Sequence, residues 1–416
     1  MSLDSQSFDA SPPARAAPAP AAVRPEVPHL SVYVTVTLLC ALAGVSLLIW
    51  AWRVQPHWFE LHMLPEYIFM GPRDAHLVVV VRWLAAAVGL ALLLLARNLG
   101  RRAGRRPAGR LIGSCLSTAA ATYLAFVTCE AIWRRHESNE RVHRLATRYE
   151  APDPTMGWQW RPSCSETVHI GGRDLLYAFN ALGNRAPSKD ANPDFDRPTI
   201  LFTGESMSFG HALNWEETFA ALVGKHLGMQ VENLSGNGYG NDQAYLRLLD
   251  QLPRFKQPRA AVTFFMTGQV KRNVYDTRPR LQLTSDGSLE PRKPSSGIAA
   301  LLRLAVFRAR FVPFHSAEAI PLTQAILRET DRRVRARGAF PLFVIQTWGP
   351  PGRSLDQYAE GWLIRTFFED QHLHYVVVDL QGDWRIPVDG HPDQRANEAI
   401  AGAIVQALKA AGIDGR

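Results

Sequence analysis

Three long apolar runs occupy the first third of the chain. Residues 30–52 carry no charge, and 23 residues are enough to cross a hydrocarbon core about 30 Å thick. Residues 77–96 contain one charge, Arg82, and residues 111–133 are diluted by serine and threonine. Three runs of this length in succession predict a membrane anchor of three helices rather than three buried core helices.

A short basic segment predicts how this anchor is oriented. The segment from Arg97 to Arg110, between the second and third runs, holds six arginines and no acidic residue. Basic residues beside a span are retained on the cytoplasmic side. We therefore expect residues 1–29, a disordered tail rich in Pro and Ala, to be cytoplasmic, and everything after residue 133 to lie outside. No aromatic residues interleave the arginines, so nucleic-acid binding is not expected.

From residue 138 onward, apolar runs rich in β-branched residues alternate with segments of helical period. Strands are expected at residues 199–203, 229–234, 260–266, 342–347 and 375–380. Helices are expected at residues 217–227, 244–252, 320–335, 355–370 and 397–411. This alternation predicts an α/β fold over residues 138–416, with a five-stranded parallel sheet between two layers of helices. Residues 276–296, rich in Pro, Ser, Arg and Lys, are expected to form a surface insertion.

Chemically active residues follow several of these strands. Open α/β sheets bind ligands at the carboxyl ends of their strands, so these residues should meet at one edge. Ser206 lies in a Gly-Glu-Ser turn after the first strand, and Gly238 lies in a glycine-rich loop after the second. Asp389 and His391 follow the fifth strand. A serine, a histidine with an acidic neighbour and backbone N–H donors are the set that acyl transfer requires.

Composition and spacing exclude several other classes of protein. With 47% hydrophobic residues, the chain has enough apolar content for a core and is not a disordered protein. Its net charge of +8 comes from arginine more than lysine, and its four scattered cysteines predict no disulfide framework. His372 and His374 lack a third ligand nearby, and the glycine-rich loops lack GxGxxG spacing. We therefore expect neither a metal nor a cofactor.

Four blocks of the sequence share a pattern with one known group of enzymes. The blocks are 177–185 (YAFNALGNR), 204–210 (GESMSFG), 233–243 (NLSGNGYGNDQ) and 389–392 (DGHP). At these residues the chain resembles the SGNH/GDSL hydrolase superfamily, and most of all its membrane-anchored members associated with polysaccharide acylation. The resemblance runs from about Tyr177 to Leu408. It implies a flavodoxin-like three-layer fold.

The resemblance implies roles for the residues at the strand ends. Ser206 would be the nucleophile and His391 the base, with Asp389 orienting the imidazole. Because three residues are the commoner spacing between this Asp and His, Asp383 or a backbone carbonyl is the alternative orienting group. The backbone N–H groups of Ser206 and Gly238 would bind the oxyanion.

The third block departs from the family pattern. Where the family has Asn-Asp after the third strand, this chain has Gly268-Gln269. Either Gln269 supplies the missing amide to the oxyanion, or only the two backbone donors are present. Three further residues are candidates for lining the substrate cleft: Glu205, Asn237 and Trp348.

The resemblance implies an enzyme of the bacterial inner membrane whose catalytic domain is periplasmic. It would act on ester-linked acyl groups, acetyl above all, of a surface glycan. Water as acceptor would make it an esterase, and a sugar hydroxyl would make it an O-acyltransferase, which would need a multi-span membrane partner to deliver the acyl group. A glycan-binding or assembly component with impaired catalysis is the alternative, because the third-block Asn is absent.

Overall fold

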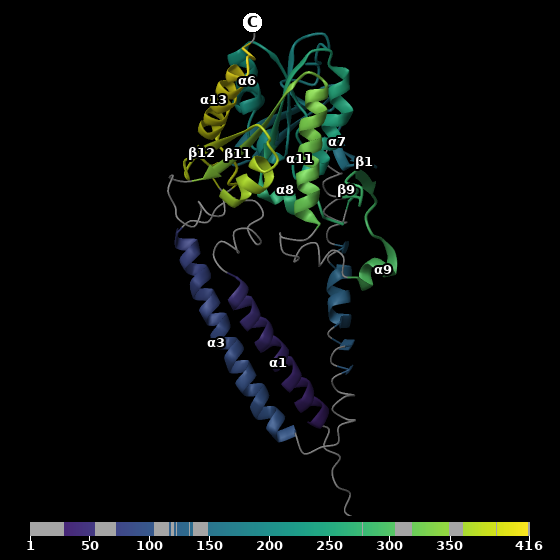
Figure 1. The fold of residues 1–416 in the computed structure, drawn as a ribbon, viewed down its shortest axis with the longest axis vertical. Helices are drawn as coiled ribbons and strands as arrows, with labels where there is room; N and C mark the ends of the chain where they lie inside the picture. The colour runs from purple at the N-terminus through teal and green to yellow at the C-terminus, as the bar shows by residue number, and fades with distance from the viewer. Residues whose placement is uncertain are drawn as a thin grey trace, which may run out of the picture.

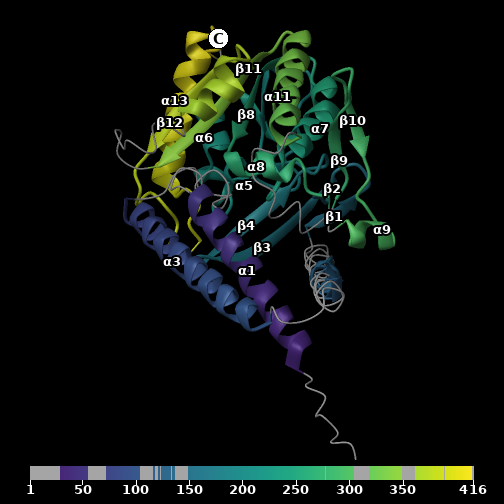
Figure 2. The same cartoon turned by 60° about the horizontal axis from the view of Figure 1, so that its bottom comes forward.

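The computed structural model describes residues 29–54, 72–103, 116–117, 120–121, 123–132, 134–135, 149–276, 278–303, 318–348, 361–387 and 389–414. Figures 1 and 2 show a pair of long helices, α1 (His29–Arg53) and α3 (Pro72–Ala103), beside an α/β domain that contains all the strands. The predicted tail lies almost entirely outside the described residues.

The two long helices suit a hydrocarbon environment. Their segments Val34–Arg53 and Val78–Arg101 are long and apolar enough to cross a membrane, yet only 17% and 11% of these segments is buried inside the protein. Core helices of a soluble domain would bury far more of their apolar surface. The helices approach closely at Gly44 and Gly89, where a Cβ atom on Gly44 would lie 2.8 Å from the Gly89 carbonyl oxygen.

Two of the three predicted spans are present among the described residues. Within the predicted third span, the described helix Tyr123–Ile132 is too short to cross a membrane, and other parts lie outside the described residues. Its hydroxyl residues lower its hydropathy, and Thr128 donates a hydrogen bond to the Leu124 carbonyl. Arg82, in the second span, donates from Nε to the Ala51 carbonyl near the end of α1, at 2.7 Å.

The α/β domain contains the five predicted parallel strands. Neighbours in the order β12-β11-β8-β6-β7 run parallel to one another. The chain passes from β6 to β7 on one side of the sheet and from β8 to β11 on the other. The topological switch point therefore lies between the neighbouring strands β6 and β8. The five strands are β6 (Thr199–Thr203), β7 (Gln230–Asn233), β8 (Pro258–Phe265), β11 (Phe340–Trp348) and β12 (Tyr375–Leu380).

Helices cover both faces of this sheet, as the alternation of apolar residues requires. Ile200 and Phe202 of β6 pack in one apolar cluster with α6 (Phe219–Leu227) and α13 (Gln394–Ala410). Leu201, which points to the opposite face, packs with residues of α7 (Asn241–Gln251) and α11 (Ala319–Ala336). The predicted three-layer arrangement is therefore present, and Figure 1 shows α6 and α13 on one side and α7 and α11 on the other.

The sheet nevertheless differs from the prediction, because it has eight strands and is mixed. Beyond β7 it continues with three antiparallel strands in the order β5-β4-β3. No apolar run marks β3 or β5 in the sequence, since β3 alternates between half-buried and exposed residues and β5 has two residues. The strands are β3 (Cys164–Ile170), β4 (Arg173–Phe179) and β5 (Arg185–Ala186).

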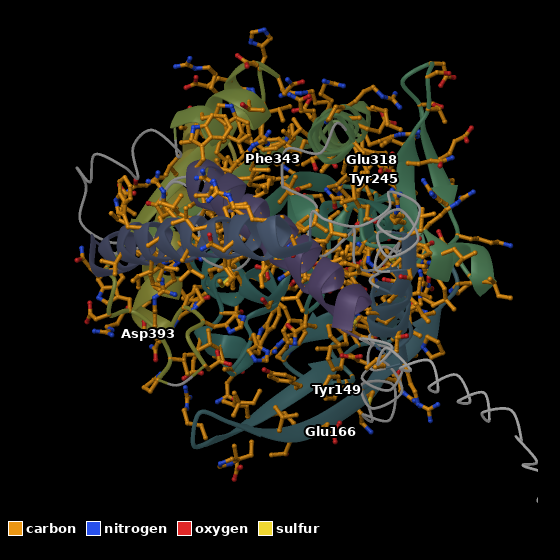
Figure 3. All side chains as sticks on the ribbon, turned by 90° about the horizontal axis from the view of Figure 1, so that it is seen from below. Tyr149, Glu166, Tyr245, Glu318, Phe343 and Asp393 are labelled. Atoms are coloured by element: carbon orange, nitrogen blue, oxygen red, sulfur yellow. The ribbon has the colours of Figure 1, made fainter. Side chains whose placement is uncertain are left out.

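Shorter elements surround this framework. The predicted insertion forms an antiparallel hairpin, β9 (Arg280–Leu283) with β10 (Leu289–Arg292). Figure 3 views the molecule from below, with Asp393 at the start of α13 on one side and Tyr149 and Glu166 beside the antiparallel strands on another. The other elements are β1 (Glu150–Asp153), β2 (Gly157–Trp160), α5 (Ser206–Phe209), α8 (Thr267–Arg272), α9 (Gly297–Leu302), the 3-10 turns η1 (Trp215–Glu217) and η2 (Leu252–Arg254), and the π-helical turn η3 (Arg365–Glu369).

Candidate active site

A sharp turn from β6 into α5 presents Ser206 at the carboxyl edge of the sheet. Gly204 adopts φ +151, and a Cβ atom there would lie 3.0 Å from the Cβ atoms of Phe264 and Ser208, so the turn requires glycine. Glu205 caps α5 by accepting a hydrogen bond from the Met207 N–H at 2.9 Å. The turn therefore fixes the backbone on both sides of Ser206.

The loop after β12 brings Asp389 and His391 to this serine. His391 Nε2 lies 2.9 Å from Ser206 Oγ, and His391 Nδ1 lies 2.7 Å from Asp389 Oδ1. Asp389 also accepts a hydrogen bond from the His391 backbone N–H at 3.2 Å. A spacing of two residues is thus compatible with the contact, because the carboxylate bonds both the ring and the backbone of His391.

The alternative orienting residue, Asp383, lies elsewhere. Its carboxylate accepts a hydrogen bond from Arg395 at 3.2 Å, and its side chain is 75% exposed. Burial alone would raise the pKa of Asp389, but His391 and His211 nearby and the hydrogen bonds from His391 lower that pKa below its ordinary value. Asp389 is therefore anionic at neutral pH, as a group that orients an imidazole must be.

Ser206 also contacts a second carboxylate. Its hydroxyl donates to Glu205, whose side chain is fully buried and lies 3.7 Å from the Arg272 guanidinium. The serine proton thus has two acceptors within reach, Glu205 and His391. Glutamate is one methylene longer than aspartate, which lets this carboxylate reach the hydroxyl as well as cap the helix.

The loop after β7 supplies a backbone N–H donor, that of Gly238, beside Ser206. Gly238 adopts φ +74, a conformation that glycine tolerates best. Within the described part of the chain, the backbone N–H groups of Ser206 and Gly238 have no hydrogen-bond acceptor. The loop is braced from behind, because the buried Trp160 indole donates to the Ser235 carbonyl at 2.9 Å. The two N–H groups are therefore available to bind an oxyanion without a large rearrangement of the loop.

These segments enclose a pocket of about 200 Å³. Its wall is drawn from four loops, each at the carboxyl end of a parallel strand. The lining residues are Glu205, Ser206, Met207 and His211 after β6, Asn237 and Gly238 after β7, Met266 and Arg272 after β8, and Gly390 and His391 after β12.

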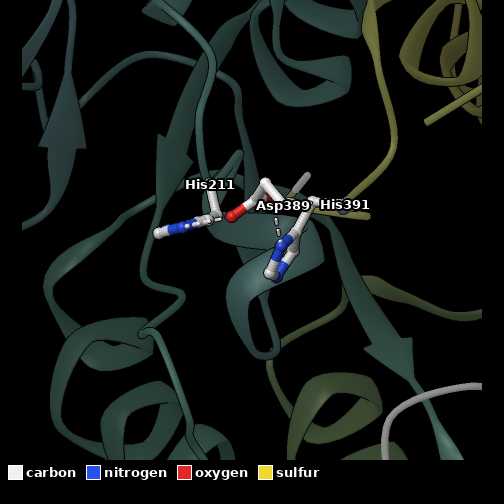
Figure 4. A group of neighbouring side chains, drawn as sticks. All are labelled: His211, Asp389 and His391. Carbon is white, nitrogen blue, oxygen red and sulfur yellow. Dashed lines mark hydrogen bonds and ion pairs between the residues drawn. The ribbon is translucent and has the colours of Figure 1, made fainter. Parts of the chain in front are cut away.

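Five pocket residues were not predicted from the sequence, and the two of them with polar or charged side chains are His211 and Arg272. His211 Nε2 lies 3.4 Å from Asp389 Oδ2, and its ring lies 4.5 Å from that of His391 (Figure 4). Arg272 donates to the Tyr239 carbonyl at 3.3 Å in addition to its contact with Glu205. His211 directly follows the Ser206 block, so its position was the available signal. Nothing in the sequence placed the last turn of α8 over the pocket.

Three predicted site residues do not line the pocket. Asp389 contacts the ring of His391 without lining the pocket itself, and the other two are Gln269 and Trp348. Gln269 is fully buried, and its carbonyl oxygen accepts hydrogen bonds from the Met266 N–H at 3.0 Å and from Asn241 at 3.2 Å. It therefore caps α8, and it is not among the residues that line the pocket. Trp348 belongs to the main apolar core, with the Arg385 guanidinium 3.6 Å above its ring. The other cleft candidates, Glu205 and Asn237, do line the pocket.

One group of residues at this site has the donor set of a metal centre. His211, Asp389 and His391 each offer a ligand atom, and these atoms lie within 4.8 Å of one another. Two imidazoles and a carboxylate would suit zinc. In this structure, however, each of the three groups already has a protein partner in the contacts described above.

No protein-family model and no curated protein matches the sequence. Among solved structures, the chain is similar to a protein assigned to the lipolytic G-D-S-L family from Desulfitobacterium hafniense DCB-2, with 12% identity and a TM-score of 0.31 over 50% of this chain and 98% of that one. It is also similar to the esterase EstA from Pseudoalteromonas sp., with 16% identity and a TM-score of 0.31 over 51% and 97%. For a family two carbohydrate esterase from Cellvibrio japonicus, the identity is 14% and the TM-score 0.31 over 54% and 64%.

The G-D-S-L family is the one that the four sequence blocks resemble. At these identities and TM-scores the structural similarities carry no weight for the reaction. The function is therefore argued from the geometry around Ser206.

Proposed function

We propose that this chain is a membrane-anchored serine esterase or O-acyltransferase of the SGNH type. The observation that carries the proposal is the hydrogen-bonded series from Ser206 to His391 to Asp389, at 2.9 and 2.7 Å, beside a pocket at the switch point of the sheet. Such a series activates a serine hydroxyl that is otherwise a weak nucleophile.

In the first half of the reaction, Ser206 Oγ attacks the acyl carbonyl carbon while its proton passes to His391 Nε2. The carbonyl oxygen becomes an oxyanion, which the N–H groups of Ser206 and Gly238 stabilise. The bond from the acyl carbon to the alcohol oxygen then breaks, and His391 returns the proton to the leaving alcohol. An acyl-Ser206 ester remains. Asp389 stabilises the imidazolium that forms transiently.

In the second half, an acceptor hydroxyl attacks the acyl-Ser206 ester and gives its proton to His391. The bond to Ser206 Oγ breaks, and His391 reprotonates the serine. Water as acceptor releases a carboxylic acid, and a sugar hydroxyl yields a new ester. Two backbone donors serve the oxyanion in both halves, since Gln269 is not among the residues that line the pocket.

The pocket size favours a short acyl group. At about 200 Å³ it is smaller than the roughly 300–1,000 Å³ typical of drug-sized ligands. An acetyl group fits within this volume. The sequence resemblance to polysaccharide-acylating proteins supports a glycan as carrier.

The same proposal includes a location. Helices α1 and α3, with the predicted third span at residues 111–133, would anchor the chain in a bacterial inner membrane with the α/β domain in the periplasm. Two spans alone would return the chain to the side of its N-terminus, so this location requires the third span. A transferase would then need a multi-span membrane partner as acyl donor. Alkaline phosphatase fused after Arg416 should be active, whereas a fusion at Gly104 should be inactive, and the reverse pattern would contradict this orientation.

The test of the reaction uses the full chain in detergent micelles with p-nitrophenyl acetate and p-nitrophenyl octanoate. We expect hydrolysis of the acetate, much weaker hydrolysis of the octanoate, and release of acetate from an acetylated polysaccharide. Activity that persists in Ser206→Ala would contradict the proposal. Binding of the polysaccharide without any hydrolysis would favour the non-catalytic glycan-binding role instead.

A further inference from the structure

His211 joins two loops that come from distant parts of the sequence. Its Nδ1 atom lies 3.2 Å from Asn237 Nδ2, in the loop that carries the oxyanion glycine. Its Nε2 atom lies 3.4 Å from Asp389 Oδ2, in the loop that carries the base. Asp389 is thus held between two imidazoles, with one carboxylate oxygen toward each (Figure 4).

One protonation state of His211 satisfies both contacts. The Asn237 amide nitrogen is a donor, so Nδ1 must carry a lone pair. The proton of a neutral imidazole then lies on Nε2, from which it is donated to the Asp389 carboxylate. Burial, followed by the charge of His391, lowers the pKa of His211 to about 4, which keeps this neutral form at physiological pH. The charged or titratable groups around it are His391, Asp389 and Arg185.

The backbone on both sides of His211 is held by buried residues. Ala212 adopts φ +59, an uncommon conformation for a residue with a side chain. It is retained because the Ala212 N–H donates to the Tyr177 hydroxyl at 2.8 Å, and Arg185 donates to the Leu213 carbonyl at 2.6 Å. Arg185 is itself buried, with its guanidinium 4.1 Å from the Tyr177 ring centroid. Strain beside a pocket residue that is fixed in this way typically accompanies a functional constraint.

We propose that His211 is a positioning residue that holds the oxyanion loop and the Asp389–His391 loop in register for acyl transfer. This inference rests on the proposed function. Through Nε2 it fixes the second carboxylate oxygen of Asp389, which leaves the first aimed at His391. Through Nδ1 it fixes Asn237, the residue before Gly238. A shift of either loop would separate the oxyanion donors from the base.

Three substitutions at His211 separate the two hydrogen bonds from simple packing. His211→Phe keeps a ring against His391 but loses both bonds. His211→Gln places an amide N–H near the Nε2 position and keeps the bond to Asp389, and His211→Asn keeps a partner for Asn237 but is too short to reach Asp389. Each variant is prepared as the full chain in micelles, its melting temperature is recorded, and kcat and KM for p-nitrophenyl acetate are compared.

We expect His211→Phe to lower kcat by about 10- to 100-fold, the effect of losing a hydrogen bond to a charged group, with a much smaller change in KM. His211→Gln should recover most of that loss, and His211→Asn less of it. The double variant with Asn237→Ala should lose less than the product of the single losses, because the two residues act through one contact.

The outcomes distinguish this inference from the proposed function. A kcat for His211→Phe equal to that of the wild type, with hydrolysis still dependent on Ser206, would overturn the positioning role alone. A loss that Gln does not recover, or that follows the melting temperature, would also overturn it. Loss of wild-type activity in EDTA, restored by zinc, would assign the three residues to a metal instead. Hydrolysis that persists in Ser206→Ala would overturn the proposed function.

Discussion

Two polar clusters of this molecule share a design but differ in what surrounds them. The reaction cluster holds one carboxylate between two imidazoles, and a second, buried cluster holds one carboxylate between two amides. The reaction cluster consists of Ser206, His211, Asp389 and His391, and the buried cluster consists of Asn180, Asn184, Glu232 and Arg247. In the buried cluster, Glu232 of β7 accepts hydrogen bonds from Asn180 at 3.1 Å and from Asn184 at 2.7 Å.

The difference lies in proton chemistry and access. Amides at Asn180 and Asn184 cannot take up a proton, and Glu232 is only 5% exposed, so this carboxylate can only hold the turn between β4 and β5 against β7. Around Asp389 the partners are imidazoles, and one of them contacts a serine that lines a pocket. A carboxylate between two nitrogen groups is thus structural or reactive according to whether one of its partners can take a proton from an accessible nucleophile.

Burial favours the neutral form of a titratable group in both clusters, but it shifts the pKa values of Glu232 and His211 in opposite directions. Burial is the largest influence on Glu232 and raises its pKa to about 7, and it is also the largest influence on His211 and lowers its pKa to about 4. In each case the neutral form is favoured, because a charge loses hydration in the interior. The two groups therefore contribute to stability in opposite directions as the pH changes.

The largest expected effect is in the reaction cluster. Ser206→Ala should reduce hydrolysis of p-nitrophenyl acetate by about 10³-fold or more, because no other group supplies the nucleophile. The free energy of unfolding should change little, since the side chain is only partly buried and its partners face the pocket. Turnover and thermal unfolding of the same preparation in micelles provide the measurement. A large loss of stability would show that the series from Ser206 to Asp389 is structural, like the buried cluster.

The converse effect is expected at Glu232. Glu232→Ala leaves the amide N–H groups of Asn180 and Asn184 without an acceptor in the interior, which should lower the free energy of unfolding by about 2–5 kcal/mol. Hydrolysis per folded molecule should stay close to that of the wild type. Glu232→Gln is the matched control, because one amide oxygen can still accept both bonds. A loss of activity in the folded Ala variant would contradict the separation between the two clusters.

The sequence predicted the parallel half of the sheet better than the antiparallel half, for a physical reason. Strands buried on both faces appear as continuous apolar runs, and β6 and β12 were predicted to the residue. In the antiparallel half, β3 is half-buried and β5 is two residues long, so neither leaves a run to find. The sequence motif at residues 177–185 was recognised, but the sequence did not show that this motif contains the end of β4 and the start of β5.

The site residues that directly follow a strand were predictable from the sequence. Those on a short helix were less so, because their place in the site depends on the direction of the side chain. Ser206, Gly238 and His391 were found because each directly follows a strand or precedes a helix in a recognisable block. Arg272 reaches the pocket from the last turn of α8, and Gln269 turns away from it to cap that same helix. The direction of a side chain on a short helix depends on packing that hydrophobic pattern does not record.

The third prediction uses the pKa of Glu232. Because this pKa is raised from 4.5 to about 7, the folded state holds a proton that the unfolded state releases between these values. The stability from this group is fully present below about pH 4.5 and is lost as the pH rises through about 7. Glu232→Gln removes the titration, so its stability relative to the wild type should increase from pH 5 to pH 8 by about 1–3 kcal/mol.

Melting temperatures of the two proteins across this range provide the measurement. His211 titrates with the opposite sign, since its contribution is present above about pH 6.5 and is lost as the pH falls toward about 4. It is common to both proteins, so the difference between them isolates Glu232. A constant difference from pH 5 to pH 8 would show that Glu232 does not change protonation there.

The smallest expected effect tests whether Gln269 has a structural role, like the buried cluster, or takes part in the reaction. Its carbonyl oxygen caps α8 through the Met266 N–H and accepts a bond from Asn241, so Gln269→Ala should lower the free energy of unfolding by about 1 kcal/mol, as losing a cap does. Its kcat should equal that of the wild type, because in the proposed mechanism two backbone donors serve the oxyanion without it. Loss of a true oxyanion donor instead costs about 10²–10³-fold in turnover. A fall of that size at unchanged stability would mean that the amide swings toward Ser206 when substrate binds, and Gln269 would then belong to the reaction cluster.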